Sequence, residues 1–125
     1  MQRESNAGQI YRSSDNGASF VSPTSALSCS ADWAYSGSLW MAVGTNGAAP
    51  QMKTSPDLST WTTVNTSFFT STVIAAAEYV PGTGLWVIGG TGGLMAYSPD
   101  ATTWTLGSVS GLGTNYIQAI TYGYI

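Results

Sequence analysis

Short runs of apolar and small residues alternate with turn-forming residues along most of the chain, and no run has the spacing of an amphipathic helix. Residues 26–35 (ALSCSADWAY) and 71–80 (STVIAAAEYV) have the length of a strand, and Gly, Ser or Pro separates each from a second apolar run. The last segment of each of the two units is rich in threonine and tryptophan, as is typical of a pleated, half-buried strand. We therefore predict an all-β chain with four short antiparallel strands in each of two units, the later strands being residues 39–44, 50–55 and 60–64 and residues 85–90, 94–98 and 103–107.

The two units are copies of one repeat. Aligning residues 27–44 with residues 73–90 without a gap brings small residues and aromatic residues into phase. Asp57 follows Asp15 by 42 residues and precedes Asp100 by 43 residues. A period of this length is typical of β-propellers, in which each repeat forms one blade. The gapless alignment pairs Asp32 with Glu78, Trp33 with Tyr79 and Trp40 with Trp86.

The three aspartates lie in short motifs, SSDNGASF at 13–20, SPDLSTW at 55–61 and SPDATTW at 98–104. These motifs resemble the Asp box, and the chain is similar to Asp-box (BNR-like) β-propellers, a group that includes repeats of sialidase-like and phage or virion proteins. The resemblance implies a folding device between the third and fourth strands of each blade. Its aspartate would accept neighbouring backbone N–H groups while the following aromatic residue packs between sheets. Leu58 and Ala101 stand where the motif usually has glycine. The residues with this implied structural role are Ser13, Asp15, Gly17, Phe20, Ser55, Asp57, Trp61, Ser98, Asp100 and Trp104.

The ends of the chain complete the predicted count of blades. Residues 115–125 match only a first strand, and residues 1–25 match the strands that would follow it. We therefore predict three blades per chain: a blade remnant at 1–25, blades at 26–70 and 71–114, and the first strand of a shared blade at 115–125. Because a propeller needs several blades to close, we expect two chains to form a six-bladed ring, a head-to-tail homodimer with strand exchange at the chain ends. The alternatives are a trimer and a piece of a longer propeller, and Met1 with a near-integer blade count favours a whole chain.

Charge is scarce in this sequence. Only 7% of the residues are charged, the net charge is −3, and the cations are Arg3, Arg12 and Lys53. The chain therefore has no basic patch for phosphates, and we do not expect nucleic acid as a partner. We predict no membrane span and see no Sec signal, because no apolar run is long enough and the N-terminus is polar. Cys29 has no second cysteine to pair with in the chain, and we predict a small buried residue.

The acid–base groups argue against catalysis. The chain has no histidine, which is the commonest general base and zinc ligand, and two arginines cannot supply the arginine cluster of the sialidases. A glycosidase with paired carboxylates at Asp32 and Glu78, whose third equivalent is Thr121, is the enzymatic alternative. The simpler interpretation is that both carboxylates end a strand on one face of the ring. We predict no enzyme activity, no cofactor and no metal.

The remaining functions are binding and assembly. Trp33, Tyr79 and Tyr122 recur once per unit beside Asp32 and Glu78, and repeated aromatic rings can stack on sugars. Packing between blades explains the same rings equally well. We therefore predict a non-catalytic interaction module, structural or adhesive, of a virion, phage tail or cell surface, and the alternative is a carbohydrate-binding lectin. The expected partners are other copies of the chain, glycans and other virion proteins.

Overall fold

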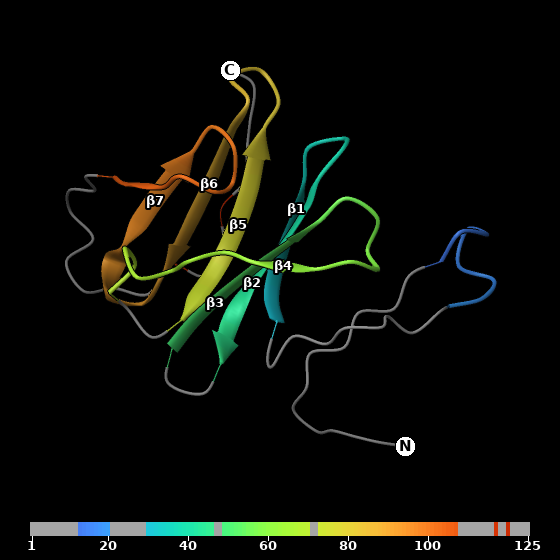
Figure 1. Cartoon of the computed structure of the whole chain (residues 1–125), viewed down its shortest axis with the longest axis horizontal. Coiled ribbons are helices and arrows are strands. Elements are labelled where there is room, and N and C mark those ends of the chain that lie inside the picture. Colours follow the sequence, from blue (N-terminus) through green and yellow to red (C-terminus); the bar gives the residue numbers. More distant parts are fainter. Residues whose placement is uncertain are drawn as a thin grey trace.

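Two antiparallel sheets make up the described structure, which is a computed structural model. It describes residues 13–20, 30–46, 49–70 and 73–107 together with Ile117 and Ile120. Within these residues the all-β class predicted from the sequence is confirmed, and each sheet has its four strands in chain order (Figure 1). The first sheet contains β1 (Ser30–Tyr35), β2 (Trp40–Asn46), β3 (Ala49–Ser55) and β4 (Thr62–Thr63), and the second contains β5 (Ile74–Val80), β6 (Leu85–Gly90), β7 (Met95–Ser98) and β8 (Thr105–Leu106).

Glycine-containing turns separate the first strands of both sheets. The β1–β2 turn contains Gly37 at φ 99°, and the β5–β6 turn contains Gly84 at φ 70°. These positive φ values favour glycine, because a side chain at such a position would be strained. The backbone N–H of Gly84 also donates to the Val80 carbonyl oxygen at 2.9 Å. After β6 the chain passes through a 3-10 turn, Thr91–Gly93.

The two sheets are equivalent in pairing, but the gapless alignment of their first strands is wrong. Tyr35 lies opposite Trp40 in the first sheet, and Tyr79 lies opposite Trp86 in the second. The structural equivalent of Tyr79 is therefore Tyr35 and not Trp33. Beyond the pair of Tyr79 and Trp86, the β5–β6 hairpin contains one more residue pair, so it is two residues longer than the β1–β2 hairpin. An insertion of two residues keeps the alternation of a strand, so the apolar pattern stayed in phase and hid the shift.

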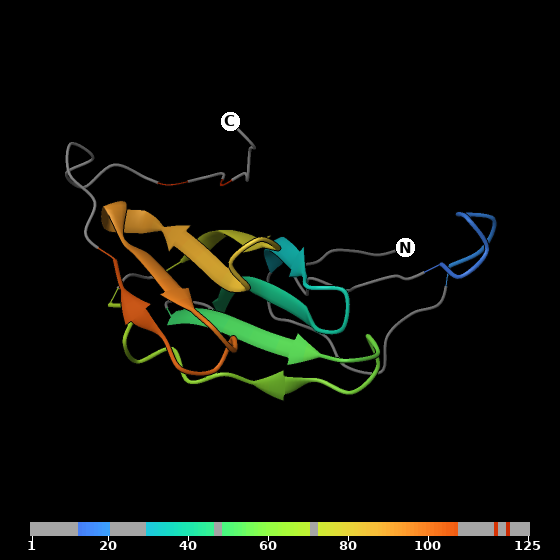
Figure 2. The ribbon, with the colours of Figure 1, turned by 90° about the horizontal axis from the view of Figure 1, so that it is seen from above.

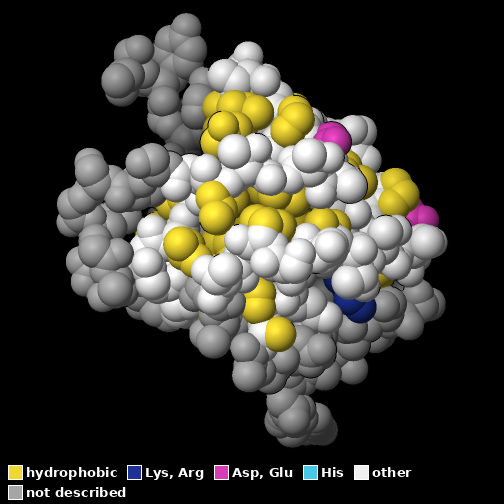
Figure 3. Space-filling view, turned by 60° about the vertical axis from the view of Figure 1, so that its left-hand side comes forward, with side chains coloured by type: hydrophobic (Ala, Val, Ile, Leu, Met, Phe, Trp, Pro, Cys, Tyr) yellow, Lys and Arg dark blue, Asp and Glu magenta, His cyan; other side chains and the backbone are white. Residues whose placement is uncertain are grey.

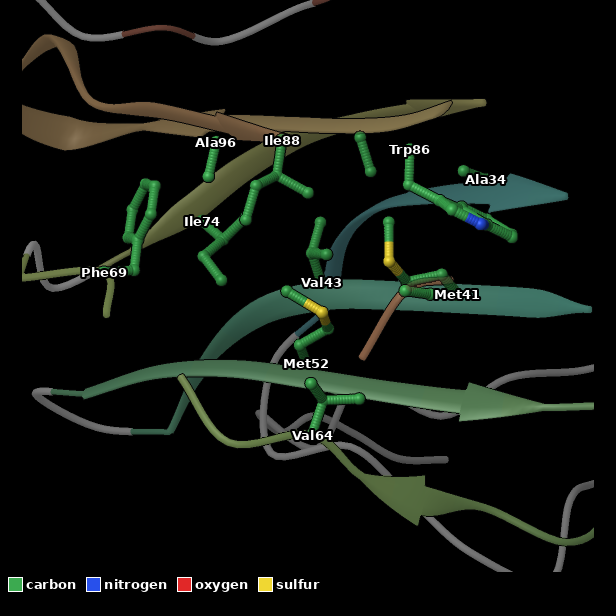
Figure 4. Close-up of a cluster of buried hydrophobic side chains, with 12 residues drawn as sticks. Ala34, Met41, Val43, Met52, Val64, Phe69, Ile74, Trp86, Ile88 and Ala96 are labelled. Carbon is green, nitrogen blue, oxygen red and sulfur yellow. The ribbon is translucent and has the colours of Figure 1, made fainter. Parts of the chain in front are cut away.

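One hydrophobic core joins the sheets face to face. Met41, Val43 and Met52 of the first sheet point toward Ile88 and Ala96 of the second sheet (Figure 4), and all five are buried. Strand β5, the first strand of the second sheet, contacts β1, β2 and β3. The second sheet therefore packs on the first through this strand (Figures 1 and 2). Complete burial of each large apolar side chain stabilises the fold by roughly 1.5–3 kcal/mol.

The predicted propeller is wrong. The described residues form two separate four-stranded sheets, and among them no sheet closes and no three-blade half or six-bladed ring is present. A repeat period encodes a repeated unit, whereas closure depends on the rotation between successive units. The predicted blade remnant 1–25 is described only at 13–20, where it forms a turn, and the predicted shared strand 115–125 is described only at Ile117 and Ile120. The predicted strand exchange between chains lies outside the described residues.

Ile117 and Ile120 lie against strand β6. The backbone N–H of Ile117 donates to the Gly90 carbonyl oxygen at 3.0 Å. A Cβ atom added at Gly89 would lie 2.7 Å from Ile117 Cγ2 and 3.2 Å from Ile120 Cδ1. The absence of a side chain at Gly89 therefore makes room for both isoleucines on this face of the second sheet.

Candidate functional site

The motif at 55–61 forms a tight turn after β3. Asp57 Oδ1 accepts the backbone N–H groups of Ser59 and Thr60, both at 2.8 Å. Ser55 Oγ accepts the N–H groups of Asp57 at 3.2 Å and Leu58 at 2.8 Å. Ser55 itself is fully buried. Two short polar side chains thus satisfy four backbone donors of the turn, which is the usual way for Asp and Ser to stabilise a turn.

The motif at 98–104 forms a closely similar turn after β7. Asp100 Oδ1 accepts the N–H groups of Thr102 at 2.8 Å and Thr103 at 2.7 Å. Ser98 is fully buried, and its Oγ donates to Asp100 Oδ1 at 2.9 Å and accepts the Asp100 N–H at 3.2 Å. The two sheets therefore enter their fourth strands through the same arrangement of serine and aspartate.

Leu58 and Ala101, the residues at the usual glycine position of the motif, have a left-handed backbone. Their φ values are 62° and 64°. A residue with a Cβ atom pays roughly 1–2 kcal/mol for this conformation. Ala101 is fully buried in the core, and Leu58 is half-buried. Both turns thus impose a conformation that glycine adopts freely on residues that are not glycine.

The motif at 13–20 also closes around its aspartate. Asp15 Oδ1 accepts the Ser19 N–H at 2.8 Å, and Asp15 Oδ2 accepts the Ser19 hydroxyl at 2.6 Å. Ser13 Oγ accepts the Gly17 N–H at 2.8 Å. This turn differs from the other two because it is exposed, and Phe20, its aromatic residue, is 62% exposed.

Hydrogen bonds lower the pKa of all three aspartates. The hydroxyl of Ser19, followed by that of Ser13, lowers the pKa of Asp15 to about 2. The pKa of Asp57 is lowered chiefly by the N–H of Thr60, and the pKa of Asp100 chiefly by the N–H of Thr103. Each carboxylate is therefore held in its charged form, in which it is the better acceptor.

The tryptophans that follow the two sheet turns pack differently. Trp104 stacks on Phe68 with ring centroids 5.8 Å apart and packs against the main core. Trp61 meets Trp33 edge to face at 5.7 Å and covers Ala42. The indole N–H groups of Trp61 and Trp104 are buried without a hydrogen-bond partner in the described part of the chain. These rings therefore contribute by packing.

The first sheet presents an aromatic surface on the side away from the core. We name Trp33, Tyr35, Trp40 and Trp61 the aromatic face. Directly paired residues share a face of a sheet, and Trp33 pairs with the buried Ala42 while Tyr35 pairs with Trp40. The rings of Tyr35 and Trp40 are stacked with centroids 4.0 Å apart, and Tyr35 is 45% exposed. The aromatic face is therefore accessible to a partner, although its rings already pack on one another.

The second sheet also has a face directed away from the core. We name Glu78, Val87, Met95 and Tyr97 the distal face. Val87 pairs with Glu78 on one side and with Tyr97 on the other. Tyr97 is 42% exposed, and the other three side chains are half-buried. Ile117 and Ile120 lie on this side of the sheet at Gly89.

Asp32 and Glu78 do not form a carboxylate pair. Asp32 lies between the two sheets, where Oδ1 accepts the Trp33 N–H at 2.8 Å and Oδ2 accepts the Ala77 N–H at 3.0 Å. Glu78 lies on the distal face, and its Oε1 accepts the Tyr79 N–H at 3.1 Å. Asp32 therefore links the sheets through a backbone amide.

The predicted ligand-binding residues do not meet in one site. Trp33 belongs to the aromatic face, Tyr79 packs against the core, Glu78 belongs to the distal face and Asp32 lies between the sheets. Tyr122 lies outside the described residues.

Tyr35 and Trp40 were not predicted from the sequence as candidate binding residues. The available signal was an aromatic residue on each side of the short segment SGSL, because residues that flank a hairpin turn lie opposite each other.

Comparisons with protein-family models, curated proteins and solved structures find no match to this chain. Among the described residues, no group of three or more His, Cys, Asp and Glu side chains could hold a metal ion. The described residues also form no helix with the length and apolarity that a membrane span requires.

Proposed function

We propose that this protein is a non-catalytic interaction module with a structural or adhesive role on a virion, phage tail or cell surface. The observation that carries the proposal is the aromatic face, which places four aromatic side chains on the side of the first sheet that no described strand covers. Aromatic rings dominate the energetics of many protein interfaces. On the face shown in Figure 3, hydrophobic side chains reach the surface between polar ones, and the few charged side chains in view lie in its right-hand half. Such a surface favours contact with a partner over repulsion.

The described carboxylates accept hydrogen bonds from backbone N–H groups, which further supports a role without catalysis. Asp15, Asp57 and Asp100 hold turns, and Asp32 accepts two amides. We expect no hydrolysis of sialoside, glucoside or ester substrates. Turnover that disappears in Asp32→Asn or Glu78→Gln would contradict the proposal.

Adhesion tests the aromatic face directly. Beads coated with the protein should bind cells or virions that carry its partner, and coating with Tyr35→Ser should reduce the binding severalfold. Tyr35→Phe keeps the ring and is the matched control, because it removes only the hydroxyl that donates to the Gly37 carbonyl oxygen at 2.8 Å. Equal binding by wild type and Tyr35→Ser would show that the aromatic face is not the contact surface.

Carbohydrate binding is the second candidate, and the Tyr35–Trp40 stack favours it. The ring of Tyr35 rests on that of Trp40 and leaves 45% of the tyrosine exposed, so one flat surface is open to the apolar side of a sugar ring. A glycan array with the purified protein would reveal such a ligand, and Tyr35→Ser should abolish the signal. An array without any signal would leave structural assembly as the function.

A further inference from the structure

We propose that the aromatic face binds an acidic polysaccharide, with one sugar ring on the stacked rings of Tyr35 and Trp40 and a sugar carboxylate or sulfate at Lys53. This inference rests on the proposed function, because it names the class of ligand that the aromatic face takes. Its basis is the charge beside the stacked rings and the difference between this face and the equivalent face of the second sheet.

Lys53 is the only lysine or arginine among the described residues, and it lies on the side of the aromatic face. It pairs with Ala42, which also pairs with Trp33, and directly paired residues share one side of a sheet. Lys53 is half-buried, and its amino group has no ion-pair or hydrogen-bond partner within the described part of the chain. The amino group is therefore available to an external anion.

Two carboxylates near the aromatic face in the sequence are held by other groups. Asp57, which follows Lys53 by four residues, accepts the backbone N–H groups of its own turn. Asp32, next to Trp33, lies between the sheets and accepts the Ala77 N–H. The positive charge of Lys53 thus remains for a ligand.

Lys53 is close enough to serve a ligand on the stacked rings. Trp40 precedes Ala42 by two residues on the same strand, so Lys53 and Trp40 form a diagonal pair on one side of the sheet. Diagonal pairs are roughly 7–8 Å apart, within reach of long side chains. Thr63 pairs with Lys53 from the outer strand and is exposed, so it adds a hydroxyl group on this side.

The two sheets can be compared position by position on this side. Trp40 lies opposite Ser55 in the first sheet, as Trp86 lies opposite Ser98 in the second. Two residues farther from the hairpin turn, each sheet has a row of paired residues at equivalent positions. The row is Trp33, Ala42 and Lys53 in the first sheet and Ala77, Ile88 and Ala96 in the second.

The row of the second sheet is built for contact with another sheet. Ala77 and Ala96 are buried there, because their small side chains let the first sheet pack closely. Trp33 and Lys53 replace these alanines on the aromatic face, and both are half-buried. Bulk and charge at these positions disfavour the same sheet packing. They favour a ligand that offers both an apolar surface and an anion.

An acidic polysaccharide offers these groups together. The apolar side of a sugar ring can stack on the exposed ring of Tyr35. A carboxylate or sulfate on that ring accepts charge-assisted hydrogen bonds from Lys53, and sugar hydroxyls can exchange hydrogen bonds with Thr63. An acidic peptide would bring the charge to Lys53, but its carboxylate side chains have no flat ring to place on Tyr35.

Paired polymers test the need for charge. Polygalacturonate and its methyl ester share one sugar ring, and dextran sulfate and dextran share another, so each pair differs in charge. Isothermal titration calorimetry of the full chain should show binding to at least one charged polymer, at least about tenfold tighter than to its neutral counterpart. Binding of polygalacturonate identifies a carboxylate as the anion, and binding of dextran sulfate identifies a sulfate. Binding of neither charged polymer, or equal binding of charged and neutral polymers, would overturn the proposal.

Variants of Lys53 and Tyr35 locate the site. Lys53→Ala installs the residue found at the equivalent Ala96 and should weaken binding of the charged polymer at least about fivefold, whereas Lys53→Arg keeps the charge and should bind like wild type. Tyr35→Ser should also weaken binding, and Tyr35→Phe should not. Circular dichroism should show the wild-type fold in each variant, and Lys53→Gln replaces Lys53→Ala if that variant unfolds.

The contrary outcomes are separate from failure of the proposed function. Wild-type binding by Lys53→Ala would overturn the role of Lys53, and polyglutamate that binds as tightly as the acidic polymer would show a site for charge alone. If bead adhesion falls in Tyr35→Ser while neither acidic polymer binds, the aromatic face is a contact surface and only the acidic polysaccharide is wrong. If the polymers bind through Lys53 but adhesion does not depend on Tyr35, the adhesive role is wrong and the site stands.

Discussion

At the scale of single residues, Asp57 and Asp100 make stability depend on pH. Because their pKa is lowered from the ordinary 3.8 in the folded chain, they favour folding above that value, and this contribution is lost as the pH falls through the folded pKa. The melting temperature should therefore decrease between about pH 5 and pH 2. Asp57→Ala and Asp100→Ala should each lower the melting temperature at pH 7 by several degrees, and the double variant should show a flatter pH profile. Unchanged melting in both single variants would contradict the turn role.

Leu58 tests the strain in the same turn. Leu58→Gly removes a Cβ atom from a left-handed residue and should raise the free energy of unfolding by about 0.5–1 kcal/mol, after the greater flexibility of glycine in the unfolded chain is subtracted. Leu58→Val is the opposing control, since a β-branched residue fits this conformation worst. Chemical denaturation should rank the variants Gly, Leu, Val in decreasing stability, and any other order would show that side-chain contacts outweigh backbone strain at this position.

At the scale of elements, Gly89 controls how the C-terminal residues meet β6. Gly89→Ala introduces a Cβ atom 2.7 Å from Ile117 Cγ2, so the isoleucine must move. The Ile117 N–H, which is bonded to the Gly90 carbonyl oxygen, should then exchange with solvent at least about tenfold faster, as expected for a local opening. The effect should shrink in an Ile117→Ala background, which removes the clashing methyl group. Equal exchange in wild type and Gly89→Ala would show that the segment does not depend on this contact.

At the scale of the whole molecule, the two sheets share one core and should unfold together. Met52 and Ile88 belong to the same buried cluster although they come from different sheets. Met52→Ala and Ile88→Ala should each lower the free energy of unfolding by about 2–5 kcal/mol in one transition, seen at the same denaturant concentration by fluorescence and circular dichroism. Met52→Leu should cost less than about 1.5 kcal/mol, because it conserves volume. Two separate transitions would show that each sheet folds on its own.

The sequence by itself determined the features that depend on neighbours along the chain. The strand class, the repetition of the unit and the position of the turns were all readable, because alternation, punctuation and short polar side chains act within a few residues. The motifs at 55–61 and 98–104 accordingly stand at the ends of third strands. Tyr35 was missed for a related reason, since a two-residue difference in a hairpin leaves the local pattern unchanged.

Only the tertiary structure decided which faces meet. The sequence marks both sides of each sheet as apolar or aromatic, and it does not encode the rotation that carries one sheet onto the next. The packing buries Trp86 and leaves its equivalent Trp40 half-exposed, and it places Asp32 between the sheets while Glu78 faces away from the core. The six-bladed ring was a wrong prediction for the same reason, because ring closure is a property of the angle between packed sheets and not of a repeat period.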